Sequence, residues 1–146
     1  MQGQRQSTKA MNMNESEPRR PDGDAVEVRV PADVGYVSTL RLTAASLAAR
    51  CDLTIDDIED LRLAVDEACA LLLPHANAGS TLDARFELAK DRLAVAASVE
   101  TAETAELDRA GFAWTVLDAL ATSVDVRSAD GRLTILVTKA RETATA

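Results

Sequence analysis

The sequence is poor in the residues from which most catalytic and metal sites are built. It has one histidine, His75, and two cysteines, Cys51 and Cys69, in 146 residues. A Cys/His zinc site cannot be assembled from this set, and no Gly-x-Ser-x-Gly motif accompanies the histidine. Most hydrolase chemistry is therefore excluded. The cysteines are not spaced as Cys-x-x-Cys, and we interpret them as buried thiols that pack as small apolar side chains.

Long hydrophobic runs are missing as well. No apolar run approaches the ~20 residues that a membrane-spanning helix needs, and the N-terminal segment lacks the apolar stretch of a secretory signal. We therefore expect a cytoplasmic protein. Residues 1–24 are polar and without periodicity, which predicts a disordered tail. One domain is expected over residues 25–140, followed by a short polar tail over residues 141–146.

Positive charge is in deficit. The chain has 16 basic and 24 acidic side chains, for a net charge of -8. The first 24 residues carry four charges of each sign, so the whole acidic excess lies in the remainder. An acidic domain repels nucleic-acid phosphates, and we expect no direct nucleic-acid binding. The charge suits a basic protein partner, although acidity also keeps small proteins soluble.

Hydrophobic periodicity predicts five strands and three helices. The strands are expected over residues 25–30, 82–88, 93–99, 124–128 and 133–138, and the helices over about residues 33–50, 55–73 and 112–121. Thr54 and Asp57 form a capping box before the second helix, and Pro74 ends it. We expect the first helix to bury Val34, Val37, Leu40, Ala44 and Leu47, and the third to present Phe112, Val116 and Leu120 on one side.

This element order, β-α-α-β-β-α-β-β, predicts a two-layer α/β (α+β) sandwich. Three helices would lie on one face of a mixed five-stranded sheet. With one Trp, one Tyr and two Phe, the core must be built from aliphatic side chains. A homodimer would help to stabilise such a core.

The segment from Ile58 to Ala76, IEDLRLAVDEACALLLPHA, carries the most specific pattern in the chain. It resembles the first ATP-binding box of the anti-sigma factor serine kinases, which belong to the superfamily of gyrase, histidine-kinase and MutL ATPases. That box has the pattern Ala-Val-x-Glu-Ala-x-x-Asn followed by a His-Ala or His-Gly pair. The residues that fit it in register are Ala64, Val65, Glu67, Ala68, His75 and Ala76. The resemblance covers about residues 25–140 and implies a Bergerat-like ATPase fold.

The nucleotide-binding residues of that family are only partly present. By register, Glu67 is the relic of the catalytic carboxylate, and Leu71 stands where the family has the Asn that holds Mg²⁺. Glu100 replaces the Asp of the Asp-x-Gly-x-Gly loop, and no glycine follows it before Gly111. Ala113 replaces the second glycine of the last box. Leucine offers no oxygen to a hard cation, so we expect no catalytic residue, no metal and no bound cofactor.

The partner-binding candidates come from the same resemblance. Arg41, on the first helix, matches the family's partner-binding arginine, and the alternative is a solvated helix charge. We group Tyr36, Glu67 and Glu103 with it. His75 is either a ligand contact or a structural residue at a helix end, and Trp114 either a core anchor or an exposed contact. The acidic loop with Glu100, Glu103, Glu106 and Asp108 is either solvated or meets a partner.

The resemblance implies an anti-sigma factor of a stress-response type. Such a protein sequesters an alternative RNA polymerase sigma factor, and an anti-anti-sigma protein of the sulphate-transporter/anti-sigma-antagonist class releases it through partner switching. Because the ATP-binding boxes are degenerate, we expect a pseudokinase that acts by binding alone. One alternative is an active serine protein kinase that uses ATP and Mg²⁺ to phosphorylate its antagonist. A second alternative is a non-catalytic ligand-sensing module.

Overall fold

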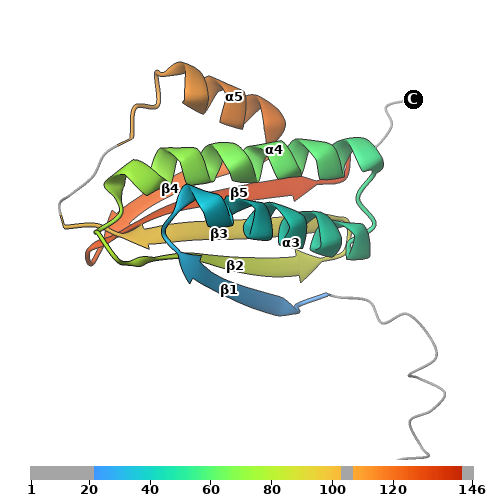
Figure 1. The fold of residues 1–146 in the computed structure, drawn as a ribbon. Helices are drawn as coiled ribbons and strands as arrows, with labels where there is room; N and C mark the ends of the chain where they lie inside the picture. The colour runs from blue at the N-terminus through green and yellow to red at the C-terminus, as the bar shows by residue number, and fades with distance from the viewer. Residues whose placement is uncertain (1–21, 103–106, 143–146) are drawn as a thin grey trace, which may run out of the picture.

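The computed structural model describes residues 22–102 and 107–142. The expected N-terminal tail therefore lies almost wholly outside the described residues, as do Glu103, Glu106 and the last four residues. The described chain forms one sheet with a layer of helices on one face (Figure 1). In these ranges, none of the helices is both long and apolar enough to cross a bilayer.

The predicted elements are all present in the expected order. The strands are β1 (Ala25–Pro31), β2 (Thr81–Ala89), β3 (Arg92–Glu100), β4 (Ser123–Ala129) and β5 (Arg132–Ala140). The helices are α3 (Val37–Arg50), α4 (Ile55–Leu72) and α5 (Phe112–Leu120), with 3-10 turns η1 (Val34–Tyr36) and η2 (Leu73–His75). The two-layer α/β class predicted from periodicity is confirmed.

The sheet has the strand order β1-β2-β3-β5-β4, and every neighbouring pair is antiparallel. The expectation of a mixed sheet is therefore wrong. Two of the pairs are hairpins, whose short turns force antiparallel pairing. The direction of the β3–β5 pair is set by the return of the chain through α5, which strand periodicity does not encode.

Alternation of side chains places the apolar half of each strand beneath the helices. The largest fully buried side chains come from all the main layers: Phe86, Leu40, Leu61, Leu72, Leu82, Leu93, Leu117, Leu133 and Ile135. Both cysteines are free and buried, as predicted. The core is mainly aliphatic, with Phe86 and Trp114 as its buried aromatic side chains, in keeping with the scarcity of aromatic residues.

Local chemistry explains where the helices begin and the hairpins turn. The Thr54 hydroxyl accepts a hydrogen bond from the Asp57 amide at 3.1 Å, and the Asp57 carboxylate accepts one from the Thr54 amide at 3.3 Å. The predicted capping box is thus confirmed. Asp91 (φ 62°) turns the first hairpin, and Asp130 (φ 55°) with Gly131 (φ 72°) turns the second. Asp and Gly are among the residues that tolerate this left-handed backbone.

Two details of the helices differ from expectation. The first α-helix begins at Val37 rather than near residue 33, because Asp33 caps a 3-10 turn through a 2.7 Å bond to the Gly35 amide. As a result Val34 is 78% exposed instead of buried. In α5 the buried side chains are Trp114 and Leu117, whereas Phe112 is 83% exposed. The face predicted from Phe112, Val116 and Leu120 is therefore wrong.

Candidate functional site

The positions that match the nucleotide boxes lie on α4, at the end of β3 and at the start of α5. Helices α4 and α5 pack against each other, and Figure 1 shows α5 lying over α4 at the β4–β5 side of the sheet. Glu67 is half-buried on α4. Its carboxylate has no hydrogen-bond or ion-pair partner among the described residues. Its position leaves it accessible for a polar contact.

Leu71 lies one turn beyond Glu67 and packs, half-buried, against the hydrophobic core. Its side chain presents only hydrocarbon where a Mg²⁺ ion would need an oxygen ligand. Within residues 22–102 and 107–142, no group of three His, Cys, Asp or Glu side chains could hold a metal ion. The residues at this position therefore do not fit a magnesium site.

The main chain at the end of β3 is tied to neighbouring segments. The Glu100 carbonyl accepts a hydrogen bond from the Asn77 amide at 2.9 Å, and the Thr101 amide donates to the Gly131 carbonyl at 2.9 Å. Thr101 is buried, while the Glu100 side chain is exposed. These bonds hold the segment as the extension of a strand. It lacks the glycines that the sequence resemblance leads us to expect in this loop.

A carboxylate, that of Asp108, lies beside the residues that precede α5. The Asp108 side chain accepts a hydrogen bond from the Ala110 amide at 2.9 Å, and its carbonyl accepts one from the Gly111 amide at 3.2 Å. Amides at a helix start are the donors that bind phosphate in nucleotide sites. The two occupied amides precede the helix, and no side chain caps its first turn. The negative charge of Asp108 beside this end of the helix nevertheless disfavours a phosphate there.

Arg41 is paired within the chain rather than free. Its Nη1 atom lies 2.8 Å from Asp66 Oδ1 and 2.9 Å from Oδ2, which joins α3 to α4. Each of the two side chains is 31% exposed. The pair borders a groove of about 290 Å³ that is otherwise mostly apolar, lined by Val34, Val37, Ser38, Ala70 and Leu73. Sequence reasoning singled out Arg41 as a candidate and did not identify Asp66 as its neighbour.

The other candidates have simpler surroundings. Trp114 is 9% exposed, and the Arg109 guanidinium lies 5.1 Å from its ring centroid, so its interpretation as a core anchor of α5 is confirmed. Tyr36, in η1, is 46% exposed. His75 is half-buried in the 3-10 turn after α4. Glu103 lies outside the described residues.

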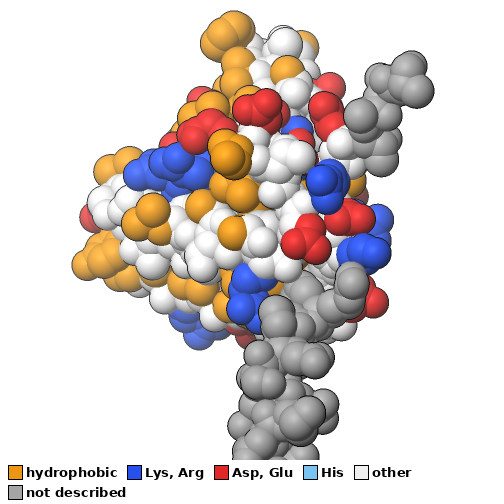
Figure 2. Space-filling model, turned by 90° about the vertical axis from the view of Figure 1, so that its right-hand side faces the viewer, with side chains coloured by type: hydrophobic (Ala, Val, Ile, Leu, Met, Phe, Trp, Pro, Cys, Tyr) orange, Lys and Arg blue, Asp and Glu red, His pale blue; other side chains and the backbone are white. Residues whose placement is uncertain are grey.

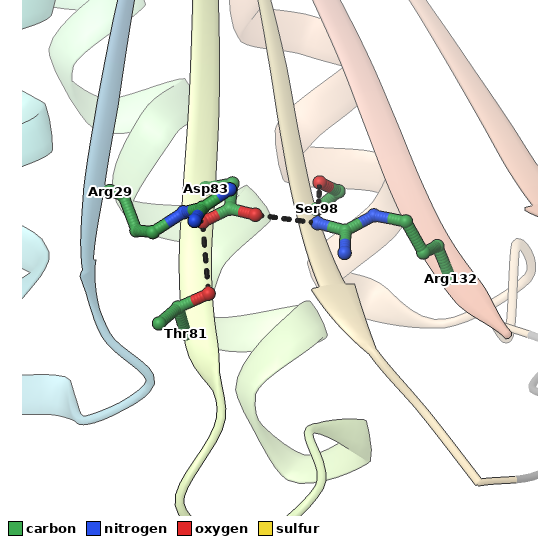
Figure 3. Close-up of polar contacts among 5 residues, drawn as sticks. All are labelled: Arg29, Thr81, Asp83, Ser98 and Arg132. Carbon is green, nitrogen blue, oxygen red and sulfur yellow. Dashed lines mark hydrogen bonds and ion pairs between the residues drawn. The ribbon is translucent and has the colours of Figure 1, made fainter.

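The face of the sheet opposite the helices carries a separate polar network (Figure 3). The Asp83 carboxylate accepts hydrogen bonds from Arg29 and Thr81, each at 3.0 Å, and from Arg132 at 2.8 Å. Arg132 also donates to the Ser98 hydroxyl at 2.8 Å. These contacts link β1, β2, β3 and β5. Since each charged side chain lies against one of opposite charge, the network stabilises the sheet and is not an open site for an anion.

Comparisons with known proteins agree with the fold. Residues 30–139 match the model of the family described as histidine kinase-like ATPase domain. A serine-protein kinase RsbW of Bacillus velezensis is 43% identical over 76 residues, which are 49% of this chain and 47% of that protein. RsbW of Staphylococcus aureus is 38% identical over 79 residues, or 51% and 50% of the two chains.

A solved structure extends the similarity to the three-dimensional level. The crystal structure of the RsbU and RsbW domains of Rv1364c from Mycobacterium tuberculosis superimposes with a TM-score of 0.61 at 16% identity. The match covers 82% of this chain and 34% of that one, and at this identity it supports the fold alone. The chain spans about half the length of the curated relatives that it matches.

Proposed function

Because the chain belongs to the histidine kinase-like ATPase domain family, we propose that it is an anti-sigma factor that acts by binding alone. In this proposal it sequesters an alternative RNA polymerase sigma factor in the cytoplasm. An anti-anti-sigma protein of the sulphate-transporter/anti-sigma-antagonist class then takes an overlapping surface and releases the sigma factor. Overlapping sites make the two bindings mutually exclusive, which is the requirement for partner switching.

The observation that supports the proposed absence of kinase activity is Leu71, which the sequence resemblance aligns with the metal-binding position. Phosphoryl transfer depends almost entirely on positioning and on neutralising the phosphate charge, which the metal ion supplies. A hydrocarbon side chain cannot take that role. The carboxylate of Asp108, which lies beside the start of α5, adds a second, independent obstacle, because its negative charge repels a phosphate there.

The surface that would hold the partners is the outer side of the α3–α4 pair. Exposed apolar side chains lie on these helices and on the η1 turn before α3: Val34, Tyr36, Leu42 and Leu63. Among the acidic side chains of α4, those of Asp56 and Glu67 have no hydrogen-bond or ion-pair partner among the described residues. Figure 2 shows exposed hydrophobic side chains next to acidic and basic ones on one side of the molecule. Such a surface suits a partner with apolar anchors and basic flanks.

Calorimetry tests the two halves of the proposal separately. The full chain is titrated first with Mg-ATP and then, one at a time, with purified alternative sigma factors and antagonist proteins of the source organism. We expect no heat with Mg-ATP, saturable binding of one sigma factor, and its displacement by one antagonist. Micromolar Mg-ATP binding would overturn the nucleotide-free half, and failure of every sigma factor to bind would overturn the anti-sigma half.

A homodimer is part of the proposal, because an aliphatic core of this size gains from a subunit interface. Light scattering coupled to size-exclusion chromatography tests it, with twice the chain mass as the expected result. A monomer at micromolar concentration would remove the dimer and leave the binding function standing.

An active serine protein kinase is the second candidate, and Glu67 is the observation in its favour. The residue keeps the register of the family's catalytic carboxylate and has no partner among the described residues. Transfer of radiolabel from ATP to an antagonist protein, abolished in Glu67→Gln, would favour this candidate. We expect no transfer from the wild-type chain.

A further inference from the structure

The contact between Arg41 and Asp66 uses only one of the three guanidinium nitrogens of Arg41. Both carboxylate oxygens of Asp66 approach the same nitrogen, Nη1, at 2.8 and 2.9 Å. The Nε and Nη2 atoms of Arg41 donate to no described residue. A guanidinium is planar and rigid, so a carboxylate that holds one nitrogen fixes the direction of the remaining donors.

The surroundings of the pair favour a role in recognition. Arg41 and Asp66 are the charged members of an otherwise mostly apolar groove between α3 and α4, whose walls include Val37, Ala70 and Leu73. Low polarity around a charged pair strengthens the hydrogen bonds that it makes. Leu63 lies one turn before Asp66 on α4 and is 46% exposed, which extends the apolar surface past the pair.

We propose that Asp66 is a positioning residue that holds Arg41 ready to donate to an oxygen acceptor of the protein partner. The proposal rests on the anti-sigma function given above and specifies its contact. The partner places an apolar side chain in the groove and an oxygen acceptor, from a carboxylate or a helix-end carbonyl, against the outer edge of Arg41. Because Asp66 fixes Arg41 before binding, less side-chain entropy is lost in the complex.

The chain offers a matched control on the same helix. Arg62 Nη1 contacts both carboxylate oxygens of Glu59 at 2.9 Å, so the two pairs have the same bond pattern. The Glu59–Arg62 pair does not line the groove, and Glu59 is 54% exposed. Loss of Glu59 therefore removes an ion pair of the same kind without touching the proposed contact.

The test is a double-mutant cycle for binding of the sigma factor identified by calorimetry, with the full chain. We expect Asp66→Ala to weaken binding about tenfold, a typical coupling between residues in contact. Arg41→Ala weakens it at least as much, and Asp66→Ala then adds nothing in the Arg41→Ala background. Glu59→Ala leaves the affinity unchanged. Equal losses from Asp66→Ala in both backgrounds, or unchanged binding, would overturn the proposal.

A second readout follows Arg41 itself without any partner. In Asp66→Asn, which preserves the shape of the side chain, we expect the NMR order parameter of the Arg41 Nε–H group to fall, while that of Arg62 stays as in the wild type. An unchanged order parameter would contradict positioning by Asp66. A wild-type chain that binds no sigma factor contradicts the proposed function, whereas wild-type binding that Asp66→Ala leaves intact contradicts only this inference.

Discussion

The Lys139 ammonium lies 3.2 Å from Asp60 Oδ2 and 3.0 Å from the Leu120 carbonyl oxygen. One side chain on β5 thereby joins α4 to the C-terminal end of α5. The Lys139 side chain is 6% exposed, whereas that of Asp60 is 42% exposed. The ammonium thus depends on these two acceptors, and it also neutralises the partial negative charge at the end of α5.

Loss of Asp60 should therefore cost more than loss of Lys139. We expect Asp60→Asn to lower the free energy of unfolding by about 2–3 kcal/mol, because it leaves a buried ammonium without its counter-charge. Lys139→Met should cost only about 1 kcal/mol, since the remaining carboxylate reaches water. Urea denaturation of the two variants and of the double variant measures this order. The double variant should resemble Lys139→Met, and the reverse order would contradict this account of the pair.

The outer network around Asp83 should contribute to sheet stability. Asp83→Ala removes the acceptor shared by Arg29, Thr81 and Arg132, and we expect a loss of about 1–2 kcal/mol that shrinks as salt is added. Asp125→Ala is the control, because its contact with Arg127 is long, at 3.8 Å, and both side chains are largely exposed. That variant should stay within about 0.5 kcal/mol of the wild type. Equal effects in urea denaturation would show that the network adds nothing beyond an ordinary surface pair.

Because of the Cys69 thiol, we expect the free energy of unfolding to depend on pH in the alkaline range. Burial, assisted by the negative charge of Asp66, raises the pKa of Cys69 to about 12. In the unfolded chain the thiol ionises near its usual pKa of about 8.5. The folded state holds the proton more tightly, so Cys69 makes its full contribution to the free energy of unfolding below about pH 8.5. That contribution is lost as the pH rises toward the pKa of the folded thiol.

We therefore expect the free energy of unfolding of the wild type to fall more steeply above about pH 8.5 than that of Cys69→Ala. The difference between the two slopes should approach one proton, or about 1.4 kcal/mol per pH unit. Urea denaturation between neutral pH and the alkaline limit of the native state measures both profiles. Burial also raises the pKa of Cys51, but that residue is present in both proteins and cancels. Parallel profiles would mean that Cys69 ionises as readily in the folded state as in the unfolded one.

The elements of the fold could be predicted from the sequence because their signals are local. The strand alternation, the Thr54–Asp57 capping box and the Asp130-Gly131 turn each depend on residues within a few positions of one another. The face of α5 could not be predicted in this way. Its sequence, FAWTVLDAL, is apolar around most of the helix, so that contact with α4 and not periodicity selects Trp114 and Leu117.

The same difference between local and distant signals applies to the residues of the candidate site. Leu71, Gly111 and Ala113 could be placed by register with a family pattern, because each is defined by its position along the chain. The partner of Arg41 could not, because Asp66 comes next to it only when α3 and α4 pack together. Lys139 is similar, since it occupies an inward position of β5 where alternation predicts an apolar side chain. Polar contacts between elements that are distant in the sequence therefore could not be predicted from the sequence alone.

Leu71→Asn restores the residue type that the family uses for metal binding, and we expect it to destabilise the protein without restoring nucleotide binding. The side chain packs against the core, and an amide placed there loses apolar contact and gains no partner, which should cost about 2 kcal/mol. Leu71→Met, which conserves volume, should cost less than about 1.5 kcal/mol. Urea denaturation compares the two variants.

Calorimetry with Mg-ATP supplies the functional half of the same test. Even with an oxygen ligand at position 71, the Asp108 carboxylate still lies beside the start of α5 and the chain still lacks glycine between Glu100 and Ala110. A metal ligand alone does not remove the repulsion between the Asp108 carboxylate and the phosphates. We therefore expect no heat of binding. Micromolar binding by Leu71→Asn would mean that the charge of Asp108 does not prevent phosphate binding, and that a single side chain separates this fold from nucleotide binding.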